Sequence, residues 1–353
     1  MKILGHRFLA ISLSALMIVS LFAGCSDKTT DNEKDNVNKT GSAAETITFR
    51  VSQSKSASHP YQKGVEMFAE LVREKYGDRF DFDIYPDGQL GNNTEVLEAC
   101  QLGEIDMVVT DDGQLSNLVA DFSVMGLPFL FEDTDHVLRV VNGEVGETLS
   151  ATLEDKGLVV ICWLENGFRY ITNNRGPIRT PEDLKGLKIR VPTSGLYVQT
   201  FNMLGAQATP IAANELFSAL QLGTVEAQEN SLANVIDQNM SEVQKYLSIT
   251  RHVHTTEPIV MSVESWNKLT DDEKTAFLEI GKEVSEWSYH YTEDQEVSQL
   301  EQIAELGMEI NDDVDVDAFR AAVRICTANT KASILNFFPA FRMVNEEVQY
   351  GPL

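Results

Sequence analysis

Between residues 46 and 110, hydrophobic and polar positions follow two alternating periods along the chain. A strand pattern, with apolar residues at every second place or in a short buried run, occupies Ile47–Ser52, Phe80–Tyr85 and Ile105–Thr110. His59–Tyr76 and Thr94–Leu102 place their apolar residues at helical spacing instead. This order of strand, helix, strand, helix and strand predicts a parallel sheet that is covered by helices.

The rest of the chain continues this α/β mixture. Leu158–Leu164 is an apolar strand, and Leu187–Val191, which Pro192 ends, is expected to begin a second sheet. Asp271–Leu306 is a long helical pattern that starts with a capping box at Thr270. The other expected elements are helices at Tyr197–Leu204, at Asn214–Leu222 and from Val316 into Ile334–Val344, a strand tip at Val225–Ala227, and a strand at Leu247–Thr256 that crosses between lobes. Roughly 310 residues beyond position 45 exceed the usual limit of a single core and predict two lobes.

The first 45 residues do not resemble a folded domain. Lys2 and Arg7 precede the apolar run Phe8–Phe22, which is too short for a spanning helix and is typical of a signal peptide. Ala23-Gly24-Cys25 then resembles a bacterial lipobox, so residues 1–25 are expected to be a lipoprotein signal with a lipidated Cys25; an ordinary secretory peptide is the alternative. Residues 26–45 are polar and are expected to form a disordered tether.

The net charge and the cysteine content exclude several classes of ligand. The chain carries a formal net charge of −26, and loss of the signal would make it −28, so it repels nucleic acid and anionic lipid. An anionic ligand would therefore need a local positive site. Cys100, Cys162 and Cys326 are an odd set without metal-binding spacing, and we expect small buried side chains, with a single bridge as the alternative.

Arg169 and Arg190 stand among apolar residues rather than on a charged face. Arg190 lies inside the predicted strand Leu187–Val191. A buried arginine is unfavourable unless an anion meets it. In so acidic a chain, a carboxylate that arrives from outside is one candidate partner, and a structural ion pair with one of the many acids is the other.

Several short motifs occur in an order and spacing that identify a known family. They are Gly88-Gln89-Leu90-Gly91, Gly103-Glu104-Ile105-Asp106, Leu127-Pro128-Phe129-Leu130-Phe131, Asn166-Gly167-x-Arg169, the run from Pro181 to Pro192, Leu204-Gly205-Ala206 with Thr209-Pro210, and Gln228-Glu229-Asn230. From about Ile47 to about Lys282 the chain resembles the DctP-type solute-binding proteins of TRAP transporters, the tripartite ATP-independent periplasmic systems for organic acids.

The resemblance implies an α/β fold with two lobes, a periplasmic-binding-protein-like clamp with a long helix that spans both lobes. Residues 46–166 plus about 256–295 would form lobe I, and residues 167–255 plus about 296–353 would form lobe II. The partners that it implies are a small organic acid and the membrane permease subunits. We expect a monomer on the outer face of the membrane or in the periplasm, anchored by lipid, without a cofactor, a metal or bound nucleic acid.

The resemblance also assigns roles to residues of the site. Arg190 matches the arginine that forms a salt bridge to the ligand carboxylate, which suits a planar guanidinium. Arg169 matches a second ligand-contacting arginine, with an interlobe salt bridge as its alternative. Asn230 would complete the carboxylate site, or it would only form a turn. Asn166, at the end of a predicted strand, is a further candidate.

Other positions bear on the far end of the ligand. Asp111 and Asp112 follow a predicted strand and would accept hydrogen bonds from hydroxyls while repelling a second carboxylate; solvated loop acids are the alternative. Asn93 and Thr94 are weaker candidates. His59 either reaches the cleft or caps a helix, and Trp163 is expected in the core, with a stacking face for a sugar ring as the alternative. Ala213 and Gln114 stand where sialic-acid-binding relatives carry a large aromatic residue and an arginine.

These residues favour a receptor for a sugar acid such as a uronate or an aldonate. A receptor for C4-dicarboxylates, a secreted lipoprotein enzyme that acts on acidic sugars, and the accessory subunit of a sensor remain open. The sequence has no nucleotide-binding glycine motif, no GxSxG and no HExxH, and no catalytic residue is assigned. His252 and His254 share one side of a predicted strand, but no third metal ligand accompanies them, and we expect surface or hinge residues there.

Overall fold

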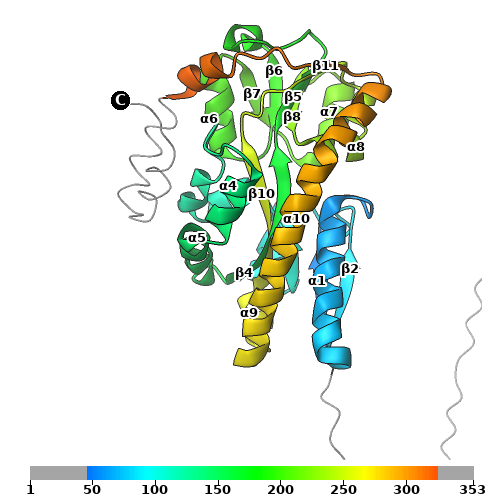
Figure 1. Ribbon diagram of the computed structural model, residues 1–353, viewed down its shortest axis with the longest axis vertical. Coiled ribbons are helices and arrows are strands. Elements are labelled where there is room, and N and C mark those ends of the chain that lie inside the picture. The colour runs from blue at the N-terminus through cyan, green and yellow to red at the C-terminus, as the bar shows by residue number, and fades with distance from the viewer. Residues whose placement is uncertain (1–45, 325–353) are drawn as a thin grey trace, which may run out of the picture. The chain divides into compact units, whose positions relative to one another are not determined.

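The computed structural model describes residues 46–324 of the chain. The expectations for the signal, for Cys25 and the tether, for Cys326 and for Ile334–Val344 lie outside these residues. Two sheets organise the described part, and the helices pack around them (Figure 1).

The first sheet contains five described strands in the order β2-β1-β3-β10-β4. The strands are β1 (Ile47–Ser52), β2 (Phe80–Tyr85), β3 (Met107–Val109), β4 (Leu158–Phe168) and β10 (His254–Ser262). β1 pairs in parallel with both β2 and β3, which confirms the parallel arrangement expected from the alternation of strands and helices. β10 is antiparallel to β3 and β4, so the sheet as a whole is mixed.

The second sheet contains six described strands in the order β11-β9-β5-β8-β6-β7. The strands are β5 (Tyr170–Asn173), β6 (Lys188–Val191), β7 (Gln207–Pro210), β8 (Ala227–Asn230), β9 (Tyr246–Ser248) and β11 (Glu309–Asn311). The chain passes from the first sheet to the second between β4 and β5, and it returns between β9 and β10. The expected single strand at Leu247–Thr256 is therefore wrong: Arg251 has a φ of 41°, which breaks the extended backbone and separates β9 from β10.

The helices were only partly foreseen. Those expected from apolar spacing are present as α1 (Pro60–Tyr76), α2 (Asn93–Gln101), α6 (Gly195–Met203) and α7 (Leu216–Gln221), and residues 316–324 are helical as well. Five further helices were not predicted from the sequence pattern: α3 (Asp112–Leu118), α4 (Thr134–Val141), α5 (Glu144–Glu154), α8 (Leu232–Asp237) and α9 (Val263–Trp266).

The long helix α10 (Asp271–Glu305) passes both sheets (Figure 1). Its capping box is formed as expected: the Thr270 side chain accepts from the backbone of Glu273, and the Glu273 side chain accepts from the backbone of Thr270. Near its start, Phe277 packs into the core of the first sheet, and near its end, Ile303 belongs to another buried cluster. Gly281 lets the helix approach β4 closely, because a Cβ there would lie 1.8 Å from the carbonyl oxygen of Ile161.

Three predicted core residues are buried. Cys100 and Cys162 are buried free thiols, and burial raises the pKa of Cys162 to about 12, so neither is a reactive thiolate. Trp163 stacks on Phe122 in the core, with ring centroids 6.2 Å apart, and does not face the cavity described below.

Candidate functional site

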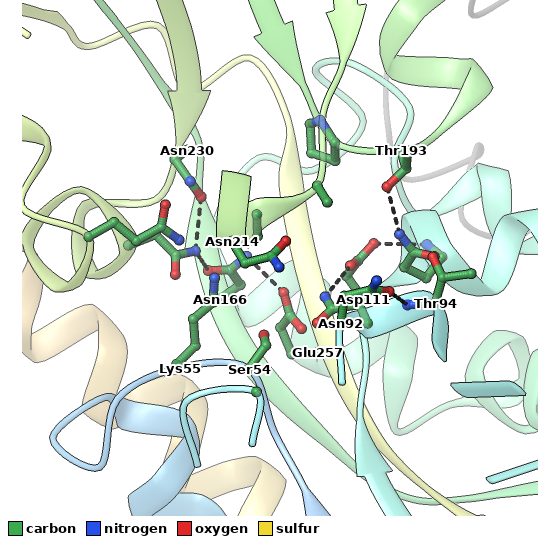
Figure 2. A pocket seen from close by; sticks show the side chains of 18 of the residues that line it. Ser54, Lys55, Asn92, Thr94, Asp111, Asn166, Thr193, Asn214, Asn230 and Glu257 are labelled. Atoms are coloured by element: carbon green, nitrogen blue, oxygen red, sulfur yellow. Dashed lines mark hydrogen bonds between the residues drawn. The ribbon is translucent and has the colours of Figure 1, made fainter. Parts of the chain in front are cut away.

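A cavity of about 360 Å³ lies where the carboxyl ends of strands from both sheets meet. The first sheet contributes residues around β1, β3, β4 and β10, and the second contributes residues around β6 and β8. Ligands of α/β proteins bind at such strand ends. Seven of the expected site residues line this cavity: Asn93, Asp111, Asn166, Arg169, Arg190, Ala213 and Asn230. Figure 2 shows several of them pointing toward a shared space.

Arg169 reaches the cavity, but an internal carboxylate already holds it. Its Nε and Nη2 donate to the two carboxylate oxygens of Glu229 at 2.5 and 2.9 Å, and Nη2 also donates to the Glu229 carbonyl. Burial alone would lower the pKa of Arg169, but the combined effect of Glu229, Tyr197 and Asp111 outweighs burial and raises this pKa. Arg169 therefore forms a structural ion pair with a carboxylate of β8, the strand that pairs with β5 directly after this arginine. The pair is not the interlobe salt bridge that was the alternative for Arg169.

The ion pair continues into a histidine. His252 Nε2 lies 3.1 Å from the Glu229 carboxylate, and its Nδ1 lies 2.8 Å from Thr250 Oγ1. Burial lowers the pKa of His252, which favours the neutral ring. The buried His254 makes a second pair of this kind, with its Nε2 2.6 Å from Glu165. The expected surface position of these two histidines is wrong, because both rings are buried and paired with buried carboxylates.

Arg190 has no such carboxylate partner among the described residues. Its Nε donates to the carbonyl oxygen of Ile211 at 2.8 Å, which fixes the guanidinium, and it forms no ion pair with any residue in the 46–324 range. The side chain is only 3% exposed, and burial lowers its pKa to about 10. A buried cation that lines a cavity without a counter-ion favours an anionic ligand.

A network of amides lies beside the arginines. Asn234, from α8, donates to the side-chain oxygens of Asn230 and Asn166 at 2.9 and 3.0 Å. Ser231 also donates to Asn166, whose own amide group donates to Glu257 at 3.1 Å. The network fixes the orientation of both predicted asparagines at the edge of the cavity (Figure 2).

The two adjacent acids have different environments. Asp111 lines the cavity, and its carboxylate caps α3 by accepting from Gln114 N at 2.8 Å. Asp112 is 1% exposed, accepts from Thr256 N at 3.1 Å and does not line the cavity. Burial, and next the charge of Asp111, raises the pKa of Asp112 to about 8. The expectation that Asp112 faces the ligand cavity is therefore wrong, because the first turn of α3 directs its side chain into the interior.

His59 is a second correction. Its Nδ1 accepts from the backbone N–H of Tyr61 at 3.2 Å, so it caps α1. It is buried and lines a different, smaller hollow between α1, α8 and α10 rather than the cavity. Thr94 and Gln114 do line the cavity, and Gln114 bridges Thr94 to Thr193 through side-chain hydrogen bonds at 3.2 and 3.0 Å.

Lys55 and Glu257 are the main residues that the sequence analysis missed. Both line the cavity and both are only 7% exposed. Glu257 lies inside β10, just beyond the range where a strand was expected, and Lys55 lies in the loop between β1 and α1. A strand predicted through residue 262 would have indicated that Glu257 is a charged residue in a buried strand.

The arrangement contains no evident metal site. Within residues 46–324 no group of three or more His, Cys, Asp or Glu side chains is placed to hold a metal ion. In the same range no helix has the length and hydropathy required to cross a membrane.

Two mixed sheets with a polar, charged cavity at their strand ends are typical of a solute-binding protein. The family model described as "Bacterial extracellular solute-binding protein, family 7" (DctP) matches residues 51–332, and the chain belongs to this family. Its members are extracytoplasmic binding proteins, and the α/β clamp with its long helix is the fold expected from the sequence.

Named relatives bind different organic acids. The chain is 30% identical to the "C4-dicarboxylate-binding protein DctB" of Bacillus subtilis (strain 168), over 82% of this chain and 84% of that protein. It is 32% identical to a TRAP periplasmic solute-binding protein of Polaromonas sp. JS666 solved with D-erythronate, with a TM-score of 0.79 over 82% of this chain and 95% of that one. A TRAP solute-binding protein of Pseudomonas putida F1 with bound D-glucuronate gives 26% identity and a TM-score of 0.81, over 87% and 99% of the two chains.

Proposed function

We propose that this chain is the receptor subunit of a TRAP transporter and binds a sugar acid of the aldonate or uronate type. Arg190 carries the proposal, because it is a buried cation that lines the cavity without a counter-ion among residues 46–324. With Nε held by Ile211, its two Nη groups are free to donate to a ligand carboxylate in parallel. Arg169 lines the same end of the cavity, but Glu229 balances its charge and holds it in place, so Arg190 supplies the net positive charge there.

The acids of the cavity favour hydroxyl groups at the other end of the ligand. Asp111 and Glu257 both line the cavity, and a second carboxylate near them would be repelled. The relatives with D-erythronate and D-glucuronate are consistent with this preference. The relative named for C4-dicarboxylates supports the alternative, a receptor with the same role for a dicarboxylate.

Binding would close two lobes, one on each sheet, around the ligand. Side chains from the two sides already meet at the rims of the cavity: Gln114 and Asn117 donate to Thr193 at 3.0 and 2.9 Å, and Ser56 donates to Asp237. A ligand that contacts both sides favours this arrangement over a more open one. Exclusion of water then strengthens the bond to Arg190, and the membrane permease subunits would receive the closed receptor.

A ligand screen tests this proposal. The protein from Ser26 onward is heated with D-erythronate, D-gluconate, D-glucuronate, sialic acid and succinate, and each hit is titrated by calorimetry. A ligand that binds only the folded state raises the melting midpoint. We expect clear shifts with one or more sugar acids and recovery of the ligand unchanged by NMR. Shifts with succinate alone would establish the dicarboxylate alternative, and turnover of a sugar acid would contradict the receptor role.

The anchor belongs to the same proposal and needs its own test. We expect Cys25 to carry the lipid, with the protein monomeric on the outer face of the membrane. Mass spectrometry of the membrane-extracted protein should find acyl chains on an N-terminal Cys25, and Cys25→Ala should move the protein into the soluble fraction. Unmodified Cys25 in the mature protein would contradict the anchor without affecting the ligand.

A further inference from the structure

Among the acids in or near the cavity, Glu257 has unused hydrogen-bonding capacity. Asp111 is occupied as a helix cap, and the Arg169 and His252 contacts described above hold Glu229. Asp112 and Glu165 each keep one carboxylate oxygen without a hydrogen bond among the described residues, but neither of them lines the cavity. Glu257 accepts one hydrogen bond of normal geometry among residues 46–324, from Asn166 to Oε1 at 3.1 Å, and the Tyr61 hydroxyl also acts on its carboxylate. A buried carboxylate has room for about four donors, so capacity for a ligand group remains.

Lys55 lies beside this carboxylate and is likewise a buried charged group with unused hydrogen-bonding capacity. Its side chain is 7% exposed and lines the cavity, yet its Nζ makes no hydrogen bond or ion pair with any residue of the described range. Figure 2 shows Lys55, Asn166 and Glu257 pointing toward one another from three separate segments. The charge of each group shifts the pKa of the other, but no salt bridge joins Lys55 and Glu257 in the described part of the chain.

Burial shifts the pKa values of both Lys55 and Glu257 in the direction that favours the neutral form, as expected for buried ions without close partners. It lowers the pKa of Lys55, which the charge of Glu257 partly opposes, and it raises the pKa of Glu257, with a further contribution from Asp111. Tyr61 is the other polar group nearby, and burial followed by the charge of Glu257 raises the pKa of its phenol. Among the described residues the Tyr61 hydroxyl has no hydrogen bond of normal geometry, although it interacts with the Glu257 carboxylate, and Tyr61 does not line the cavity. Tyr61 therefore leaves Lys55 and Glu257 open to a ligand.

The geometry points to Lys55 and Glu257 as a subsite that recognises a hydroxyl group of the ligand, and so makes this receptor specific for hydroxylated monocarboxylates. An ammonium only donates and a carboxylate only accepts, whereas a hydroxyl does both. A single hydroxyl between the two groups would therefore satisfy both at once. A carbonyl oxygen would satisfy Lys55 alone, and a second carboxylate would meet Lys55 at the cost of repulsion from Glu257. The positive charge of Arg190 also acts on Lys55, which places this subsite in the same cavity as the proposed carboxylate site.

This inference rests on the proposed function, and calorimetry can separate the two. The probes are D-erythronate and D-glucuronate, each with its monodeoxy analogues, and succinate. For the wild type we expect removal of the recognised hydroxyl to weaken binding about 10- to 100-fold, the range for hydrogen bonds to charged groups. In Glu257→Gln the same comparison should shrink to within about 3-fold, and succinate should bind as well as or better than to the wild type.

Two more variants control the interpretation. Lys55→Met removes a cation near Arg190, so it should weaken every acid and also lose the preference for the hydroxyl. Glu98→Gln makes the same chemical change as Glu257→Gln at an exposed acid of α2 that does not line the cavity, and it should leave all ratios unchanged. If Glu257→Gln fails to fold, the double variant Lys55→Met with Glu257→Gln removes both charges together and is expected to fold.

The outcomes are distinct. Full preference for the hydroxylated acids in Glu257→Gln would overturn the subsite while the sugar-acid receptor stands. Wild-type binding of succinate but of no sugar acid would overturn the proposed ligand and the subsite with it.

Discussion

Arg169 and Glu229 form a closed ion pair, with Nη2 of the arginine 2.9 Å from Oε1 of the glutamate, and Arg190 beside them has no equivalent partner in the described range. Both arginines are 3% exposed and both line the cavity. This difference decides their roles. Glu229 neutralises Arg169, so a ligand carboxylate would interact most favourably with Arg190.

Replacement of Arg190 by Ala should therefore abolish tight binding of the carboxylate. Truncation of one partner in a buried charge pair costs about 2–5 kcal/mol, or roughly 30- to 5,000-fold in affinity. Calorimetry with the acid found in the ligand screen measures the loss. Arg175→Ala, at an exposed arginine of the same sheet region, is the matched control and should bind normally. An affinity for the Arg190 variant within threefold of the wild type would refute the carboxylate assignment.

Replacement of Glu229 by Gln should destabilise the fold rather than only weaken binding. It leaves Arg169 buried without a carboxylate, which costs about 3–5 kcal/mol. Urea denaturation of Glu229→Gln, Arg169→Met and the double variant measures the coupling between the two. We expect the double variant to lose less free energy of unfolding than the two single variants lose in sum, because no lone buried charge remains in it. Strict additivity would contradict the ion pair.

Asp112 should make the stability of the protein fall as the pH rises. Its folded pKa is raised from 3.8 to about 8 by burial and by Asp111, so between these values the folded state binds more protons than the unfolded state. Stability therefore decreases from about pH 4 to pH 8, and the full contribution of the group is present only below pH 4. Asp112→Asn cannot ionise and keeps an acceptor for Thr256 N.

The stability of Asp112→Asn relative to the wild type should accordingly grow across that window. The ceiling at pH 7 is on the order of 4 kcal/mol. Denaturation curves at pH 4, 6 and 8 measure it. A difference that is constant over the three pH values would mean that Asp112 keeps an ordinary pKa in the folded protein.

Replacement of Gly281 by Ala should be strongly destabilising, because the new Cβ would lie 1.8 Å from the carbonyl oxygen of Ile161. The helix α10 must then move away from β4, at a cost of about 2 kcal/mol or more. Gly195→Ala, at the start of α6, has no heavy atom within 4 Å of the new methyl group and should be neutral or gain up to about 1 kcal/mol. Equal thermal stability of the two variants would contradict the close packing of α10 on β4.

Much of the site could be anticipated from strand ends. Asp111, Asn166, Arg169, Arg190 and Asn230 were expected in one cleft and all five line the cavity. Parallel strands bring their carboxyl ends to one edge, so residues far apart in sequence were predictable neighbours. Asp112 was misplaced because α3 was not recognised, and the helix turns adjacent side chains in different directions.

The sequence by itself determined the family, the alternation of strands and helices, the long capped helix and the residues that carry charge near the site. These features follow from local periodicity and short motifs, which each segment expresses without reference to its neighbours. Only the tertiary structure decided that Glu229 pairs with Arg169, that Arg190 has no carboxylate partner among residues 46–324, and that Lys55 faces Glu257. The physical reason is that a charge–charge bond depends on positions within a few ångströms, and those are fixed by how the two sheets and the long helix pack together.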